Sequence, residues 1–280
     1  MNKTGMMTAL TRRAFLKTTA AGLAGTVAPG LLLGGEPTIR TPRRGRVKIL
    51  AVSDMHIVDE STTAYPRKVI QAMNEEGGDL VLVCGDLAKD GKRSELETAK
   101  RVLDGLKMPY YPVLGNHDAL YSGEKEETLF KEVFGLKQNS YHFVTNGVHF
   151  VGIDHGCGKN YGKNAVRPHV MAWLKQTLAD IPDDEPIVFF SHYPFAKGVR
   201  YQTPNAAEVL ALFRKKTLLA MVGGHFHGNT EHRQDGVLMT TTACSSGTRG
   251  NHDGTKAKGY RVFHIDEQMN VTTEFKEVSP

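Results

Sequence analysis

The most regular feature of the chain is a series of short apolar runs that end at an aspartate, asparagine or histidine. The first run, residues 49–52, is followed closely by Asp54 and His56. The pattern recurs at residues 81–86, 113–118, 187–192 and 221–227. Apolar runs of this length, bounded by glycine and polar residues, are typical of buried strands in a parallel sheet. Because ligands bind beyond the carboxyl ends of such strands, the pattern predicts one site along one edge of the sheet.

The stretches between these runs have the spacing of helices. Strands are predicted at residues 47–53, 79–84, 110–114, 186–191 and 218–223, and helices at about 64–76, 93–106, 125–134, 167–180 and 205–215. Strands that alternate with helices indicate right-handed crossovers and an α/β fold. Asn146-Gly147 predicts a hairpin between residues 140–145 and 148–154. Antiparallel strands are predicted at residues 229–234, 237–242, 259–266 and 270–276.

The N-terminus differs in composition from the rest of the chain. Residues 11–17, Thr-Arg-Arg-Ala-Phe-Leu-Lys, resemble a twin-arginine export signal, and an Ala- and Gly-rich stretch follows to Leu33. That stretch is shorter than the roughly 18–20 apolar residues of a transmembrane helix, so no transmembrane span is expected. We therefore expect a signal peptide at 1–33, a linker at 34–46 and one domain at 47–280. The expected partner is the twin-arginine export machinery and the expected location is periplasmic or secreted, with cleavage or retention as an anchor left open.

Charge and cysteine content narrow the classes of function. The chain of 280 residues is 40% hydrophobic and 23% charged, which is typical of a globular protein. Of its net charge of +5, four positive charges lie in residues 1–28, which contain no acid, so only +1 remains. No nucleic-acid binding is therefore expected. Cys84, Cys157 and Cys244 are too few for a cysteine metal site; a Cys157–Cys244 disulfide stays open, and Cys84 is expected to be buried.

Five motifs at the ends of the predicted strands resemble those of the calcineurin-like metallophosphoesterase family. They are Asp54-x-His56, Gly85-Asp86, Gly115-Asn116-His117-Asp118, Ser191-His192 and Gly224-His225-Phe226-His227. The resemblance covers residues 48 to 228 and rests on all five motifs in order, since one Asp or His at a strand end is more often structural. It implies a sandwich of two mixed β-sheets flanked by helices, with antiparallel C-terminal strands.

The resemblance also implies a dinuclear metal centre. Carboxylate, imidazole and amide-oxygen ligands suit hard cations that bind beside phosphate. The implied ligands are Asp54, His56 and His227 for one ion, Asn116, His192 and His225 for the other, and Asp86 as the bridge. Two divalent or trivalent ions (Mn, Fe or Zn) would then activate a bridging hydroxide. By the same resemblance, His117 is the general acid and Asp118 orients it.

At two positions this sequence differs from related subfamilies, and these differences indicate which phosphate esters are hydrolysed. Lys89 occupies the position of the iron-binding tyrosine of purple acid phosphatases, and Asp118 stands where protein phosphatases of the superfamily have glutamate. What remains is similar to cyclic-nucleotide and related phosphodiesterases, which implies a small-molecule phosphodiester substrate. A phosphomonoesterase and a non-catalytic exported metal- or phosphate-binding protein remain alternatives. For His155, Arg249, Asn251 and His252, the sequence leaves open a place in the pocket or in a solvated loop.

Overall fold

The computed structural model describes residues 45–119, 124–155 and 164–280. The chain divides into two units, Met1–Arg40 and Thr41–Pro280, and every described element belongs to the second. The predicted signal peptide, nearly all of the predicted linker, and Cys157 lie outside the described residues. Within the described ranges, no helix has the length and apolar character needed to cross a membrane.

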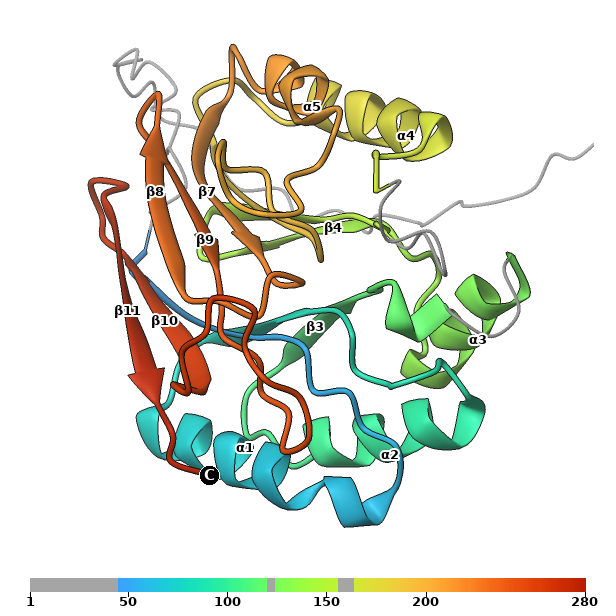
Figure 1. Cartoon of the computed structure of the whole chain (residues 1–280). Coiled ribbons are helices and arrows are strands. Elements are labelled where there is room, and N and C mark those ends of the chain that lie inside the picture. The colour runs from blue at the N-terminus through green and yellow to red at the C-terminus, as the bar shows by residue number, and fades with distance from the viewer. Residues whose placement is uncertain (1–44, 120–123, 156–163) are drawn as a thin grey trace, which may run out of the picture. The chain divides into compact units, whose positions relative to one another are not determined.

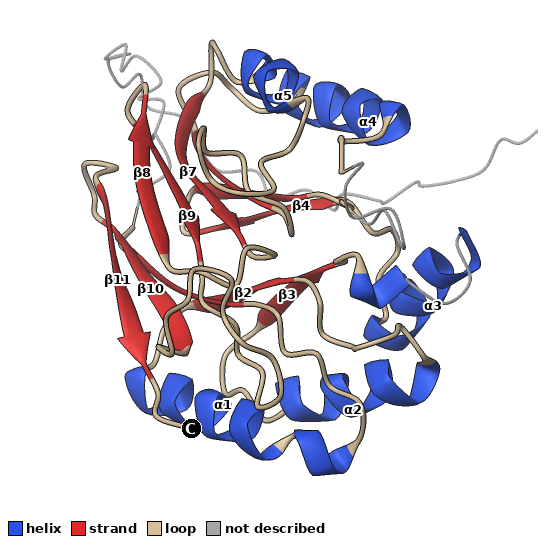
Figure 2. Cartoon of the chain, in the orientation of Figure 1, coloured by secondary structure: helices blue, strands red, loops and turns tan. Residues whose placement is uncertain are grey.

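Two β-sheets form the centre of the fold (Figure 2). In spatial order, the first contains β11 (Val271–Glu277), β10 (Gly259–Ile265), β1 (Val47–Val52), β2 (Leu80–Cys84) and β3 (Tyr110–Val113). The second contains β4 (Tyr141–Thr145), β5 (Val148–Gly152), β6 (Pro186–Phe190), β7 (Thr217–Gly223), β9 (Val237–Thr241) and β8 (Thr230–Gln234). Both sheets are mixed: β1, β2 and β3 run parallel, as do β5, β6, β7 and β9, while β10, β11, β4 and β8 pair antiparallel.

Helices cover the outer faces of both sheets (Figure 1). The first sheet carries α1 (Ala64–Glu76) and α2 (Arg93–Leu103), with α3 (Glu124–Phe134) packed against α2. The second carries α4 (Pro168–Ala179) and α5 (Ala206–Leu212). Short 3₁₀ turns, η1 (Glu60–Thr62) and η2 (His117–Ala119), follow β1 and β3. Helix α5 is shorter than predicted, because the chain turns after Leu212 to enter β7. The predicted α/β sandwich with helices on both outer faces is confirmed.

The alternation of side chains along the strands divides the core into three apolar layers. In β1, Leu50 and Val52 pack toward α1 and α2, whereas Ile49 and Ala51 face the second sheet. The middle layer joins the two sheets, and the third fills the space under α4 and α5. Because β1 is covered on both faces, it is apolar throughout rather than alternating. Cys84 lies in the middle layer and is buried, as expected.

Two sequence-based expectations about the sheets are wrong. The five predicted site segments do not share one sheet edge: β1, β2 and β3 belong to one sheet and β6 and β7 to the other. In addition, β9 is not purely antiparallel, since it pairs parallel with β7 and antiparallel with β8. Local patterns predict that a strand is buried but carry no information about which sheet it joins. The site segments nevertheless meet, because the strands of both sheets deliver them to the same end of the sandwich.

Candidate metal centre

The loops after β1 and β2 run side by side and set the positions of three acidic and imidazole side chains. The backbone N–H of Asp54 donates to the Gly85 carbonyl, and that of His56 donates to the Asp86 carbonyl, both at 3.0 Å. A parallel bridge between Ile57 and Ala88 continues the pairing. These bonds satisfy backbone groups that leave the sheet and place Asp54, His56 and Asp86 next to one another.

Backbone strain is concentrated at the same positions. Asp54, His56, Asp86, His225 and His227 all have positive φ, between 47° and 61°. Side chains other than glycine rarely adopt this left-handed region, which costs of the order of 1–3 kcal/mol at each residue. Five of the seven predicted ligands are strained in this way. The strain lowers the stability of the fold, and in return these side chains point into the site.

Two glycines allow the segments to approach one another closely. A Cβ atom on Gly115 would lie 2.3 Å from both the backbone nitrogen and Oδ1 of Asp86. A Cβ atom on Gly224 would lie 2.7 Å from the Cβ of Ser53. Gly224 therefore lets the loop after β7, in the second sheet, rest directly on the loop after β1, in the first. This contact brings the histidines of the second sheet to the acids of the first.

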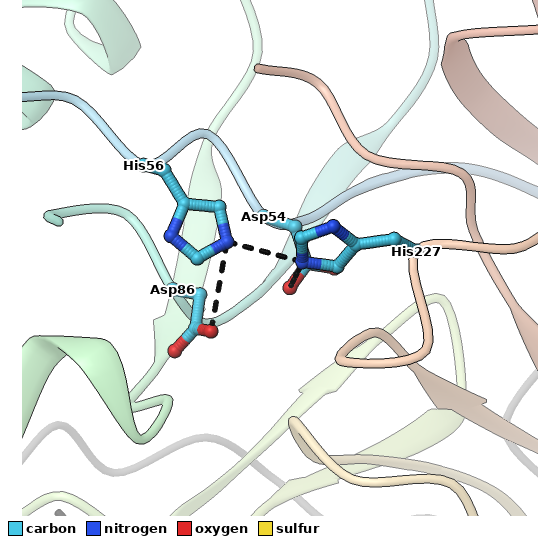
Figure 3. A group of neighbouring side chains, drawn as sticks. All are labelled: Asp54, His56, Asp86 and His227. Carbon is cyan, nitrogen blue, oxygen red and sulfur yellow. Dashed lines mark hydrogen bonds and ion pairs between the residues drawn. The ribbon is translucent and has the colours of Figure 1, made fainter. Parts of the chain in front are cut away.

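The first cluster consists of Asp54, His56, Asp86 and His227, whose potential ligand atoms all lie within 4.8 Å of one another. Figure 3 shows the four side chains converging, with the His56 and His227 rings turned toward each other. Their Nε2 atoms are 3.1 Å apart. His227 Nε2 lies 3.2 Å from Asp54 Oδ1, and His56 Nε2 lies 3.8 Å from Asp86 Oδ2. All four residues are at most 3% exposed.

The second cluster shares Asp86 with the first. His192 Nε2 lies 3.2 Å from Asp86 Oδ2 and 3.1 Å from His225 Nδ1. Asn116 joins them, since its Oδ1 is 3.2 Å from His192 Nε2. His192 is fully buried, and Asn116 and His225 are 1% and 8% exposed. The structure thus brings all seven predicted ligands into two clusters that meet at one carboxylate.

The hydrogen bonds behind the histidines make both clusters suitable for cations. His192 Nδ1 lies 2.8 Å from the Cys84 carbonyl, and His227 Nδ1 lies 3.0 Å from the Gly250 carbonyl. A carbonyl can only accept, so each Nδ1 must carry hydrogen, and in the neutral ring Nε2 presents a lone pair to the cluster. There it faces carboxylate and amide oxygens, which are acceptors too, and Asp54 Oδ1 is a buried atom without a hydrogen-bond donor. Converging acceptors of this kind require positive charge between them.

The pKa values of the cluster residues express the same need for positive charge. Burial by itself would raise the pKa of Asp54, but His227 outweighs it and lowers that pKa to about 2. Burial would lower the pKa of His227, whereas the Asp54 charge raises it to about 11. The pKa of His192 rises to about 9, because Asp86 outweighs burial. The carboxylates therefore attract either protons on these imidazoles or metal ions in their place.

His117 lies beside the first cluster, on the 3₁₀ turn η2. Its ring centroid is 4.6 Å from that of His56 in an edge-to-face arrangement. Its backbone N–H donates to Asp86 Oδ1 at 2.8 Å, and its ring Nδ1 donates to the Lys89 carbonyl at 2.5 Å. The Lys89 carbonyl thus orients the ring with Nδ1 as the donor, which leaves Nε2 as the atom that can exchange a proton with a substrate.

Asp118 was expected to orient His117, but its carboxylate accepts hydrogen bonds from backbone N–H groups. Its Oδ1 accepts the backbone N–H groups of Leu87 and Ala88, each at 2.8 Å, and its Oδ2 accepts that of Gly115 at 2.9 Å. Asp118 therefore ties the loop after β2 to the loop after β3. Burial, together with the Asp86 charge, raises its pKa to about 7 although these donors lower it. Its contribution to the site is to hold the backbone around Asp86, whereas Lys89 orients the His117 ring.

The structure separates the four residues that the sequence left open. His252 reaches the site, where its ring stacks on His227 with centroids 4.4 Å apart and planes inclined by 14°. Asn251 instead braces its own loop, because Cys244 N donates to its Oδ1 and its Nδ2 donates to the Ala257 carbonyl. His155 is buried and donates from Nε2 to the Asn164 carbonyl at 2.7 Å. Arg249 is held through its backbone: its carbonyl accepts from Lys258 Nζ and Cys244 Sγ, and its N–H donates to the Ser246 hydroxyl.

Sequence reasoning missed two tyrosines at the second cluster. Tyr193 donates from Oη to Asn116 Oδ1 at 3.1 Å. The ring of Tyr201 lies 4.9 Å from that of His225, and its backbone φ of 65° is left-handed. No local signal marks Tyr201 as part of the site. For Tyr193, the only signal is its position directly after His192.

Comparisons with known proteins agree with this geometry. The family model for calcineurin-like phosphoesterases matches residues 47–229. A probable glycerophosphodiester phosphodiesterase of Arcobacter nitrofigilis is 24% identical over 71% of this chain and 78% of its own length. A probable cyclic nucleotide phosphodiesterase of Fibrobacter succinogenes is 30% identical over 70% of this chain and 78% of its own.

Among solved structures, a purple acid phosphatase from yellow lupin shares the fold. It has a TM-score of 0.63 at 12% identity, and the match covers 85% of this chain and 52% of the phosphatase chain. The family match extends over most of the folded unit and includes every residue of the two clusters. The chain therefore belongs to the calcineurin-like phosphoesterase family, whose members are metal-dependent hydrolases of phosphate esters.

Proposed function

We propose that this chain hydrolyses small-molecule phosphodiesters with a dinuclear metal centre. The observation that carries the proposal is the pair of buried clusters that share Asp86 and present converging acceptor atoms. Asp54, His56 and His227 would hold one ion, Asn116, His192 and His225 the other, and Asp86 would bridge them. Mn, Fe or Zn ions suit this mixture of imidazole, carboxylate and amide oxygen. When bound, two such ions supply Lewis-acid stabilisation of the phosphoryl group and a nucleophilic water at neutral pH.

His117 is the residue best placed to act as the general acid. Its Nδ1 is committed to the Lys89 carbonyl, so a protonated ring offers its second N–H from Nε2. It stands beside His56 and is only partly buried, so that a substrate can reach it. The proton on Nε2 would pass to the oxygen of the leaving alcohol as the ester bond to phosphorus breaks. Proton donation of this kind contributes about 10²–10⁴ in rate.

Two observations support a diester rather than a monoester substrate. The relatives described above are named as phosphodiesterases for glycerophosphodiesters and for cyclic nucleotides. The imidazoles of His117 and His252 flank the first cluster, next to His56 and His227 respectively. One can serve the leaving oxygen while the other contacts the substituent that stays on phosphorus, a substituent that only a diester has.

The discriminating experiment is a comparison of rates with the full chain loaded with Mn²⁺. Bis(p-nitrophenyl) phosphate should be hydrolysed with a higher kcat/KM than p-nitrophenyl phosphate, and Asn116→Ala should abolish both activities. Faster hydrolysis of the monoester would establish the phosphomonoesterase alternative with the same ligands. Failure to hydrolyse either ester with Mn²⁺, Fe²⁺ or Zn²⁺ would favour the non-catalytic binding protein.

We also propose export of this enzyme by the twin-arginine route. The support is the order of Arg12-Arg13, Phe15-Leu16 and the apolar stretch to Leu33. That route carries folded proteins, which would allow the metal centre to be loaded before transport to the periplasm or the medium. Exchange of both arginines for lysine should leave the protein inside the cell, as measured by fractionation. Unchanged export of that variant would exclude the route.

A further inference from the structure

Tyr193 lies beneath the second cluster and is fully buried. It directly follows His192 at the end of β6, and the hydroxyl of Ser191 donates to its backbone carbonyl at 3.0 Å. Its backbone and its ring are therefore both held in place, and its hydroxyl group points toward Asn116.

This one side chain touches each of the three residues that belong to the second cluster alone. Its hydroxyl donates to Asn116 Oδ1 at 3.1 Å. Its ring centroid lies 4.1 Å from that of His225 and 5.1 Å from that of His192. The two ring contacts are tilted and edge-to-face, so the phenol restricts the rotation of both imidazoles.

The hydroxyl contact has a specific chemical consequence for Asn116. A carboxamide has an oxygen end and an NH₂ end of nearly equal size, and only the oxygen can bind a cation. The oxygen has two acceptor sites, of which the Tyr193 hydroxyl occupies one and leaves the other directed toward His192. If the amide turned over, its NH₂ would donate to the His192 lone pair and close the cluster without an ion. In that orientation the Tyr193 hydroxyl would have to accept from the NH₂ group. Because a phenol is a better donor than acceptor, its contact favours the orientation in which Oδ1 faces His192.

The first cluster is held by different groups. Asp54 Oδ2 accepts from the Ser53 hydroxyl at 2.6 Å and from the His225 backbone N–H at 3.1 Å. His227 donates to the Gly250 carbonyl. Backbone groups and the Ser53 hydroxyl therefore orient the first cluster. In the second cluster the Cys84 carbonyl holds His192, and Tyr193 is the side chain that donates to Asn116 Oδ1.

We propose that Tyr193 is a positioning residue that sets the affinity of the second cluster for its metal ion. This inference rests on the proposed function, because it takes Asn116, His192 and His225 as the ligands of that ion. It predicts that the two ions bind with affinities that can be changed separately. Loss of an orienting contact behind a metal ligand typically costs 10- to 100-fold in affinity.

The test is a calorimetric titration of the metal-free full-length protein with Mn²⁺. Tyr193→Phe keeps the ring and removes only the hydroxyl. Of the two binding events, the one at the second cluster should weaken by 10- to 100-fold, and the one at the first cluster should stay unchanged. The kcat measured at limiting Mn²⁺ should fall and should recover when Mn²⁺ is raised. The matched control is Tyr141→Phe, which removes a hydroxyl that donates to the Pro112 carbonyl at 2.7 Å; both events should stay as in the wild type.

A double-mutant cycle separates orientation of the amide from a general packing effect. In Asn116→Asp, either end of the side chain presents an oxygen, so adding Tyr193→Phe should change the affinity for the second ion much less. An equal effect in both backgrounds, an equal weakening of both ions, or no effect would each overturn the proposed role of Tyr193. Asn116→Ala identifies the cause: if it too leaves both events unchanged, the ligand assignment itself fails.

Discussion

The two halves of the metal centre differ in how the chain supports them. The first cluster, around His56 and His227, has a partly exposed imidazole on each side: His117 beside one ligand and His252 stacked on the other. The second cluster has Tyr193 beneath it, fully buried. The difference indicates two separate roles. The first half faces the reacting ester, and the metal affinity of the second half is set by a buried group that the substrate does not reach.

The largest effect is expected where the halves join. Asp86→Ala removes the ligand that both clusters share, so both Mn²⁺ binding events and all hydrolysis should be lost. The measurement is metal content after dialysis together with kcat/KM. Asp79→Ala, a change at a carboxylate that accepts the Lys48 backbone N–H at 2.7 Å, is the control and should keep both. An active Asp86→Ala protein would show that the bridge is not required.

The next largest effect is expected at His117, which lies beside the first cluster and is not a proposed ligand. His117→Gln should lower kcat by about 10²–10⁴ while both ions still bind, because the general acid is lost and the cluster is not. The loss should be smaller for a diester whose leaving group is a strongly acidic phenol, since such a group needs no proton. Equal losses for phenol and alkyl leaving groups would argue against the role of acid.

A third effect concerns the stability of the second half. Burial lowers the pKa of His155, whose ring lies 4.9 Å from that of Tyr193, from 6.5 to about 3. Below pH 6.5 the unfolded chain binds a proton at His155 and the folded chain does not until about pH 3. The free energy of unfolding should therefore fall across this window as pH decreases, by about 2 kcal/mol from pH 7 to pH 5.

His155→Gln should remove that share of the acid sensitivity, since Gln retains a donor for the Asn164 carbonyl and does not titrate. Urea unfolding at pH 7 and pH 5 measures the difference between the variant and the wild type. His232→Gln, at an exposed position in β8, should leave the pH dependence unchanged. If His155→Gln retained the full pH dependence, the sensitivity would belong to other groups.

The smallest effect is expected at His252 and concerns the KM for substrate. His252→Ala should raise KM for a diester by about tenfold, roughly the 1.4 kcal/mol of one hydrogen bond to a charged group, with less change for a monoester. His264→Ala, at an exposed position in β10, is the control. An equal rise in KM for both esters would show that His252 does not contact the second substituent.

The comparison between halves also shows where sequence reasoning succeeds. All seven proposed ligands could be predicted from the sequence because each stands in a short motif that follows an apolar strand and resembles a motif of the family. A motif of this kind is a local property of the chain. The backbone contacts of Asp118 were not predicted, because two of its three partners, Leu87 and Ala88, lie some 30 residues away. Tyr193 was missed for the same reason: its partner Asn116 lies 77 residues earlier.

The sequence by itself determined the strands, the family and the chemical types of the ligands, since strand periodicity and ligand identity are encoded over short distances. Only the tertiary structure decided that the site lies between two sheets and that His252 reaches it whereas Asn251 braces a loop. It also decided which carbonyls hold His117, His192 and His227. Those facts depend on the packing of segments distant in the chain, such as Gly224 against Ser53. Contacts of this kind arise from the shape of the assembled core and leave no periodic signal in the sequence.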